Sequence, residues 1–171
     1  MIIKLCDEKY IPTLIDVVIQ SYDENYLYLW HDNGAWYKEL NFNPDVLRKE
    51  MSDVDAHFYL LYDDNQVPVG FLKLNLHKKL EPNSGDECLE LERIYIKKNA
   101  AGKGIGKSAV NFTLNLARKL NKKMVWLKSM DSSPSMLFYE STGFKKIGTT
   151  RLDFELMKEE YRGMVVYAFD L

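Results

Sequence analysis

Positions 91–108 of the chain read LERIYIKKNAAGKGIGKS. A mostly apolar run leads into three glycines that lie within five positions, Gly102, Gly104 and Gly106. Apolar residues then recur at helical spacing from Ile105 to Leu120, which indicates a helix with one face against a core. The pattern therefore predicts a strand, a tight glycine-rich turn and a long amphipathic helix, in that order.

The glycine-rich turn has the properties of an anion site. Glycines let the backbone approach a ligand closely, and the first N–H groups of a helix have no partner within the helix. The helix dipole favours negative charge at the same place, and Lys103 and Lys107 add positive charge. We predict that this segment binds a phosphate or pyrophosphate. The alternative is a tight turn that binds no ligand.

One alternative identity for the turn is the P-loop of nucleotide hydrolases. The segment 101–108 fits a relaxed Walker A pattern in which Ala101 replaces the first glycine. The strand before it carries Glu90, Glu92 and Arg93, whereas a P-loop usually follows a fully buried parallel strand. We therefore disfavour nucleotide hydrolysis, which Mg²⁺-dependent affinity for ATP would support.

The flanking sequence predicts strands and helices in mixed order. We expect strands at 2–6, 57–62, 67–76, 89–97, 124–127, 145–154 and 164–169. We expect helices at 11–22, from 44 to about 51, at 105–120 and at 134–141, and a loop at 78–86. This order, with a hairpin in the middle, favours a mixed α+β protein, or an α/β protein with a mixed sheet, over a strict βαβ repeat. A single domain spanning 1–171 is predicted.

Composition excludes several classes of protein. Hydrophobic residues make up 46% and charged residues 28% of the 171 positions, which excludes a disordered or low-complexity chain. The net charge of −2 gives no global reason to bind nucleic acid or an anionic membrane, and no apolar run is long enough to span a bilayer. Cys6 and Cys88 form no disulfide framework, so we expect a cytoplasmic protein. The histidines lack metal-ligand spacing, so we expect no metal.

Two sequence blocks together resemble the GNAT superfamily of N-acetyltransferases. The segment 101–106, AGKGIG, matches the family signature Gln/Arg-x-x-Gly-x-Gly/Ala except at Ala101. The segment 132–144, SSPSMLFYESTGF, is similar to a second family block, in which Ser132 and Ser135 stand for the usual Asn and Ala. Tyr139 and the pair Gly143-Phe144 match outright. The resemblance implies the GNAT fold, a central mixed, largely antiparallel sheet with helices on both faces.

The resemblance also implies acetyl-CoA as the acyl donor. The backbone of Ile94 and Ile96 would contact the pantetheine arm, and family members carry a bulge in this strand that frees an N–H for the thioester oxygen. Segment 102–108 would hold the pyrophosphate, and Ser135 would line the CoA wall. The residues expected to contact acetyl-CoA are Ile94, Tyr95, Ile96, Ala101, Gly102, Lys103, Gly104, Ile105, Gly106, Lys107, Ser108, Ser135, Phe138 and Tyr139.

Two residues are candidates for proton transfer by the same resemblance. Glu92 is the expected general base, acting directly or through a water, and Glu90, with the same strand parity, is the alternative. Tyr139 is the expected general acid toward the CoA thiolate, because its ordinary pKa of about 10 keeps it protonated at neutral pH. The alternatives are that Glu90 and Glu92 are carboxylates that face solvent from the strand, and that Tyr139 is an aromatic residue of the core.

The segment 22–32, YDENYLYLWHD, is rich in aromatic rings and carboxylates. Family members border the acceptor site with this region, so Tyr26, Trp30 and Glu24 are the expected substrate contacts. Acids and aromatic faces suit a cationic amine or a polyamine. The alternative is an amphipathic helix extension with its rings in the core and its acids in solvent.

The leading hypothesis is a transferase that moves an acetyl group from acetyl-CoA to a primary amine by direct attack in a ternary complex. A small molecule or polyamine is the favoured acceptor, while protein N-termini, lysines, amino sugars, aminoglycosides and longer acyl donors stay open. The alternative from another class is a GNAT-fold module that binds CoA without catalysis. Edge strands near the C-terminus could pair across a homodimer.

Overall fold

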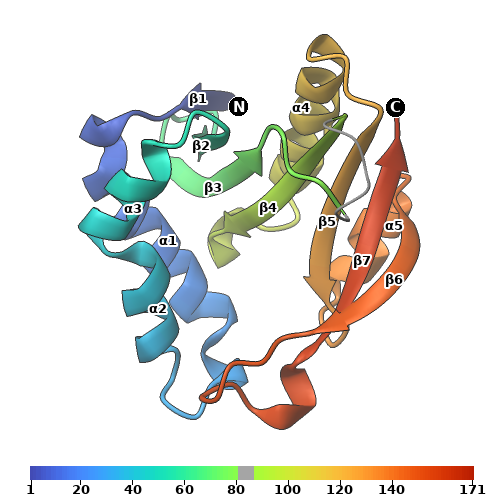
Figure 1. Ribbon diagram of the computed structural model, residues 1–171. Helices are drawn as coiled ribbons and strands as arrows, with labels where there is room; N and C mark the ends of the chain where they lie inside the picture. The colour runs from blue at the N-terminus through green and yellow to red at the C-terminus, as the bar shows by residue number, and fades with distance from the viewer. Residues whose placement is uncertain (81–86) are drawn as a thin grey trace.

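The computed structural model describes residues 1–80 and 87–171, so part of the loop predicted at 78–86 lies outside the described residues. Within them, a seven-stranded sheet has the order β1-β2-β3-β4-β5-β7-β6 (Figure 1). Only β4 and β5 pair in parallel, and every other neighbouring pair is antiparallel. The strands are β1 Ile2–Leu5, β2 Ala56–Tyr62, β3 Pro68–Asn75, β4 Cys88–Ile96, β5 Met124–Met130, β6 Lys145–Arg151 and β7 Gly163–Asp170. The predicted mixed, mostly antiparallel sheet is confirmed.

Five α-helices flank this sheet within the described residues. They are α1 Ile11–Asn25, α2 Ala35–Phe42, α3 Pro44–Met51, α4 Ile105–Lys119 and α5 Ser135–Ser141. The predicted start of α3 is confirmed, because the Asn43 side chain accepts a hydrogen bond from the Val46 N–H and Pro44 occupies the first turn. Gly143, with a φ of +95°, follows the end of α5 in the conformation common after helix ends.

Two apolar clusters fix the helices on opposite faces of the sheet. On one face, Leu14 and Val18 of α1 and Leu47 of α3 pack with Phe58 and Phe71 of the strands. On the other face, α4 and α5 cover a second cluster, whose members include Leu72, Leu89, Ala109, Val110, Leu127 and Tyr139. Helices therefore lie on both faces, as the resemblance implies, and Figure 1 shows α1 to α3 together on one side of the sheet.

The structure differs from the sequence-based expectation at α2, which the prediction did not separate from the preceding aromatic segment. Asp32 explains this helix, since its carboxylate accepts hydrogen bonds from the N–H groups of Gly34 at 2.9 Å and Trp36 at 2.7 Å. Strand β6 ends at Arg151 rather than at 154, because the following residues leave the sheet. Trp30 forms a β-bridge with Met157, and His31 donates to the Leu156 carbonyl.

Strands β4 and β5 separate along the sheet. Their parallel ladder ends at Leu91 and Leu127, although β4 continues to Ile96 and β5 to Met130. The register of β4 against β3 also shifts between Lys73 and Leu74, which leaves Glu92 as the extra residue of a β-bulge. Figure 1 shows the two strands diverging toward the segment that links β6 to β7. The divergence opens the middle of the sheet.

Candidate functional site

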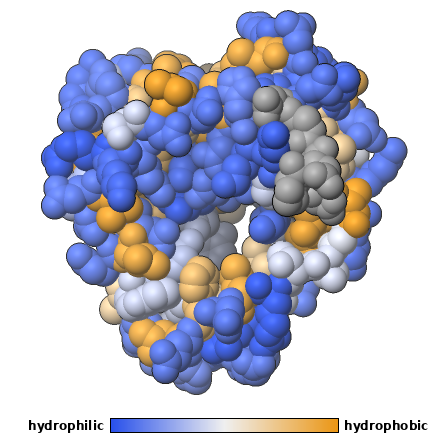
Figure 2. Space-filling view, in the orientation of Figure 1, coloured by the Kyte–Doolittle hydropathy of each residue, from blue (hydrophilic) through white to orange (hydrophobic). Residues whose placement is uncertain are grey.

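A cavity of about 780 Å³ occupies the gap between the diverging strands. Residues from both halves of the chain line it, from Tyr22 of α1 to Met164 of β7. Figure 2 shows this face of the molecule hollowed at the centre. The cavity is large enough for a small-molecule site, and such sites often lie where a sheet opens.

The glycine-rich turn forms one end of the cavity. Gly102 and Gly104 have φ values of +74° and +81°, and a Cβ placed on either would meet no atom within 4 Å. Helix α4 begins directly after Gly104, and its first internal hydrogen bond runs from the Ser108 N–H to the Gly104 carbonyl. The earlier N–H groups of α4 are therefore free of helical partners at an open surface, which fits an anion such as a pyrophosphate.

The end of β4 presents backbone groups to the gap. The Lys97 N–H donates to the Val69 carbonyl of the neighbouring strand at 2.8 Å. Because N–H groups alternate in direction along an antiparallel strand, those of Ile94 and Ile96 point away from β3 and into the gap. Asn25 of α1 donates to the Ile96 carbonyl at 3.4 Å. The bulge and the early end of the β4–β5 ladder thus leave the Ile94 N–H without a sheet partner.

Tyr139 and three serines form the wall on the α5 side. Tyr139 is only 6% exposed, lines the cavity, and its hydroxyl has no hydrogen-bond partner among the described residues. Burial first, and the nearby Tyr26 second, raise the pKa of Tyr139, so its hydroxyl stays protonated. Ser135 lies 2.8 Å from Ser129 and 2.7 Å from Ser133 by their hydroxyl oxygens. This wall therefore offers hydroxyl donors to the cavity.

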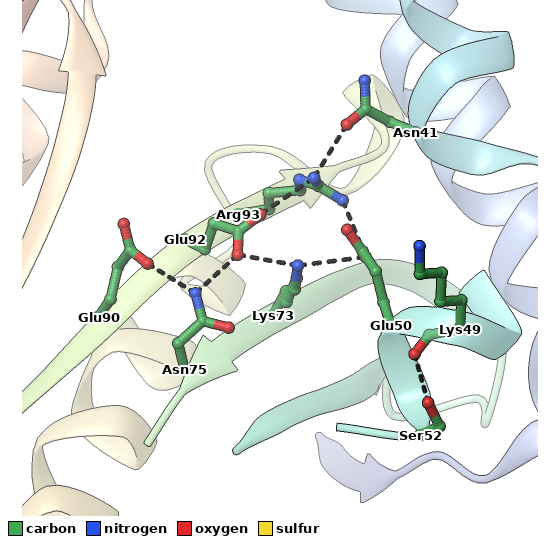
Figure 3. Close-up of polar contacts among 9 residues, drawn as sticks. All are labelled: Asn41, Lys49, Glu50, Ser52, Lys73, Asn75, Glu90, Glu92 and Arg93. Atoms are coloured by element: carbon green, nitrogen blue, oxygen red, sulfur yellow. Dashed lines mark hydrogen bonds and ion pairs between the residues drawn. The ribbon is translucent and has the colours of Figure 1, made fainter. Parts of the chain in front are cut away.

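A buried network of charged and amide side chains links β4 to β3, α2 and α3 (Figure 3). The Asn75 amide donates to Glu90 at 2.6 Å and to Glu92 at 2.7 Å. Lys73, 5% exposed, pairs with Glu92 at 2.8 Å and with Glu50 of α3 at 3.1 Å. The network therefore joins two carboxylates of one strand through one amide.

Arg93 extends the network toward α2. Its guanidinium pairs with Glu92 at 3.0 Å and with Glu50 at 3.5 Å, and it donates to the Asn41 side chain at 3.0 Å. Glu92 therefore contacts two cations, Lys73 and Arg93. Glu90 forms no ion pair with any described residue and is 8% exposed.

These different partners shift the pKa values of Glu90 and Glu92 in opposite directions. Burial first, opposed by the Asn75 hydrogen bond and aided by the charge of Glu92, raises the pKa of Glu90 above its ordinary value. Burial alone would also raise the pKa of Glu92, but the charges of Arg93 and Lys73 outweigh it and lower that pKa. Glu90 is thus the carboxylate whose protonation lies closer to neutral pH.

Aromatic and apolar side chains close the far end of the cavity. Trp30 stacks on Tyr37 with a centroid distance of 5.0 Å, and Phe154 lies 6.0 Å from each of them. Backbone bonds between the segments 29–31 and 156–158 hold the wall together, among them Lys158 N–H to the Leu29 carbonyl at 2.9 Å. Two distant parts of the chain therefore build one surface.

The structure brings most of the predicted site residues to this one cavity. Those that line it are Tyr26, Trp30, Glu92, Ile94, Tyr95, Ile96, Ala101, Gly102, Gly104, Gly106, Lys107, Ser135, Phe138 and Tyr139. Lys103, Ile105 and Ser108 are on the same turn and helix but do not line it. Glu24 does not reach the cavity either, since its carboxylate accepts hydrogen bonds from the Lys98 N–H and the Gln20 side chain.

Several functional candidates were missed by the sequence analysis. Lys73 and Asn75 contact the β4 carboxylates, Glu50 pairs with Lys73 and Arg93, and Tyr37 and Phe154 belong to the aromatic wall. No motif marks these residues, although the parity of Lys73 and Asn75 on β3 places them on one face. No group of His, Cys, Asp and Glu among residues 1–80 and 87–171 could hold a metal ion. No helix in those ranges is long and apolar enough to cross a membrane.

Comparison with known proteins places this geometry in context. A family model described as the acetyltransferase (GNAT) family matches residues 15–144. The chain is 28% identical to a Lactobacillus delbrueckii subsp. lactis protein described as an uncharacterized N-acetyltransferase, over 81% of each chain.

Solved structures share the whole architecture. The PaiA N-acetyltransferase of Thermoplasma acidophilum, solved in complex with coenzyme A, matches with a TM-score of 0.75 and 20% identity over 100% of both chains. A chimera of the Vibrio cholerae spermidine N-acetyltransferase SpeG and hSSAT matches with a TM-score of 0.72 and 16% identity, over 99% of this chain and 94% of that one. At these identities the likeness concerns the fold.

Proposed function

The chain belongs to the acetyltransferase (GNAT) family and is an N-acetyltransferase, and we propose that it moves the acetyl group of acetyl-CoA to a primary amine by direct attack in a ternary complex. Acetyl-CoA supplies an electrophilic thioester carbon and a thiol leaving group. One observation carries the proposal: an anion-binding helix start, a protonated tyrosine and a carboxylate with a raised pKa all line one cavity where the sheet opens.

The glycine-rich turn supports acetyl-CoA as the donor. The open space beside Gly102 and Gly104 leaves room for a pyrophosphate against the first N–H groups of α4, and Lys107 lines the same end. The Ile94 N–H, which points into the gap, is our candidate donor to the thioester oxygen as negative charge develops there. The Ser135 wall would border the pantetheine arm.

We assign proton removal from the amine to Glu90. Glu92 was the expected base, but its two cation partners lower its pKa and occupy its oxygens, which makes it a poor proton acceptor. Glu90 has no cation partner within the described residues and a raised pKa, which suits a general base near neutral pH. The acceptor ammonium would give a proton to Glu90, directly or through water, and its neutral nitrogen would then attack the thioester carbon.

Tyr139 is the proposed general acid. Its hydroxyl lines the donor side of the cavity, is protonated and is free to donate to the sulfur as the carbon–sulfur bond breaks. The nitrogen then loses its second proton to solvent, from which Tyr139 is reprotonated, and Glu90 releases the first proton to solvent. The products are an N-acetyl amine, CoA thiol and one released proton, so the reaction balances.

Calorimetry followed by a transfer assay tests the function. The purified protein is titrated with acetyl-CoA and, separately, with ATP and Mg²⁺; we expect micromolar binding of acetyl-CoA and no binding of the nucleotide. Release of CoA thiol is then measured with alkylamines, arylalkylamines, polyamines, amino sugars and peptides with a free N-terminus. Thiol release with any of these amines supports the proposal, whereas acetyl-CoA binding without release across the set would favour a CoA-binding module.

A further inference from the structure

We infer that the acceptor is an amine with a single positive charge on an aromatic or apolar body, and not a polyamine. The inference rests on the proposed function and narrows the class of amine that the site takes. It comes from where the structure places the carboxylates, the cations and the rings around the acceptor end of the cavity.

The carboxylates of the segment 22–32, which suggested a polyamine, are engaged elsewhere. Asp23 pairs with Lys38 at 2.5 Å. Glu24 accepts the Lys98 N–H at 2.6 Å, and Asp32 accepts two N–H groups at the start of α2. None of the three lines the cavity. The acidic surface that would hold several ammonium groups is therefore turned away from the site.

The charged side chains that line the cavity leave no partner for a second ammonium group on the substrate. They comprise the carboxylates of Glu90 and Glu92 and the cations of Arg93 and Lys128, while Lys107 lines the glycine-rich end. Glu92 is already paired with two cations, so Glu90 alone can pair with a substrate ammonium. A second positive charge on the substrate would meet like charges or rings and would lose its hydration without a partner.

The rings supply the surface for the body of the amine. Tyr37 and Phe154 are half-buried and line the cavity together with Trp30, which is buried. Met130 of β5 and Met164 of β7 also line the cavity. An aromatic or alkyl group of the substrate would bury apolar area here at about 25 cal/mol per Å², while its amine faces Glu90.

Two pairs of amines with matched size test the inference. Initial rates of CoA thiol release are measured at saturating acetyl-CoA with hexylamine against 1,6-diaminohexane, which adds one ammonium to the same chain, and with 2-phenylethylamine against spermidine. We expect kcat/KM to be at least tenfold higher for the monoamine in each pair. Equal values, or higher values for the diamine and spermidine, would overturn the inference and leave the proposed function intact. Acetyl-CoA binding with no transfer to any amine would overturn the proposed function itself.

A substitution at the mouth of the cavity sharpens the test. Leu40 of α2 lines the cavity and is 48% exposed, so Leu40→Glu places a carboxylate there without disturbing the core. We expect the ratio of kcat/KM for 1,6-diaminohexane over hexylamine to rise at least fivefold. Val54→Glu, at an 84% exposed position outside this cavity, is the matched control and should leave the ratio unchanged. An unchanged ratio in folded Leu40→Glu would place the substrate body elsewhere and overturn the inference.

Discussion

At the glycine-rich end of the cavity the surface consists of backbone from one continuous stretch, the end of β4 and the start of α4. At the opposite end it consists of side chains from α1, α2, β5, β7 and the segment 152–157. The first end is made by local conformation, and the second by contacts between residues far apart in sequence. Changes at the first end should therefore act on acetyl-CoA, and changes at the second on the amine and its proton.

The largest expected effect tests the acceptor side. Glu90→Gln keeps the shape of the side chain but cannot take a proton, so we expect kcat to fall by about 10²–10³-fold. The KM for acetyl-CoA should change less than about threefold, because Glu90 lies away from the glycine-rich turn. Steady-state kinetics at varied acetyl-CoA concentration separates these two effects. A rise in the KM for acetyl-CoA with unchanged kcat would contradict the assignment of Glu90 to the amine end of the cavity.

The pH profile supplies the control for this variant. Glu90 accepts a proton only when ionised, and its raised pKa places the acid limb of kcat above the ordinary value of 4.5. Activity should thus rise with pH through that limb in the parent protein. Glu90→Gln should lose this limb, and Glu92→Gln should retain it; a limb that disappears only in Glu92→Gln would assign the base to Glu92.

The donor side is tested by Tyr139→Phe. The hydroxyl has no hydrogen-bond partner among the described residues, so its removal should leave the fold unchanged. We expect kcat to fall by about 10–10²-fold through loss of the general acid, with the dissociation constant of acetyl-CoA changed less than about threefold. Turnover assays and calorimetry on the same preparation measure both quantities. Unchanged turnover would assign the leaving-group proton to another donor.

Glu92→Gln sharpens the comparison by separating stability from catalysis. The substitution leaves the buried Lys73 with Glu50 alone, so we expect the free energy of unfolding at pH 7 to fall by about 1–3 kcal/mol. The lowered pKa of Glu92 means that its stabilisation is present above pH 4.5 and is lost as the pH falls through the folded-state pKa. Urea unfolding at pH 7 and at lower pH should show the difference between variant and parent shrinking.

Glu90→Gln is the matched control for that measurement. The raised pKa of Glu90 means that the folded protein favours its neutral form, so a neutral glutamine should leave the free energy of unfolding at pH 7 unchanged or slightly higher. A stability loss in Glu90→Gln as large as that in Glu92→Gln would contradict the claim that only Glu92 stabilises the fold through its charge.

The smallest expected effect concerns the turn itself. Gly104 has a φ of +81°, which a β-branched residue adopts at a cost of about 1–2 kcal/mol, so Gly104→Val should distort the turn. We expect the KM for acetyl-CoA to rise about 5–10-fold with little change in the KM for the amine. Gly148→Val on β6, at a position with open space and no positive φ, is the control and should behave like the parent.

The two ends also differ in how far the sequence predicts them. The glycine-rich turn, the start of α3 at Pro44 and the order of strands along the chain follow from residues adjacent in the chain, and the structure agrees with them. Glu92 contacts Lys73 and Asn75 of β3 as well as its neighbour Arg93, and the two contacts to β3 depend on tertiary structure that no local pattern encodes. Composition likewise marked the segment 22–32 as acidic and aromatic, but only packing decides which side chains enter the cavity.

The link between the segments 28–31 and 156–158 has a consequence for how the protein is made. The ammonium of Lys158 donates to the Tyr28 carbonyl across 130 residues of chain, and Trp30 pairs with Met157. During synthesis the residues of the glycine-rich turn and α5 are added before the segment 156–158. The aromatic wall therefore cannot form until the segment 156–158 has been added, although its partner segment is synthesised more than a hundred residues earlier.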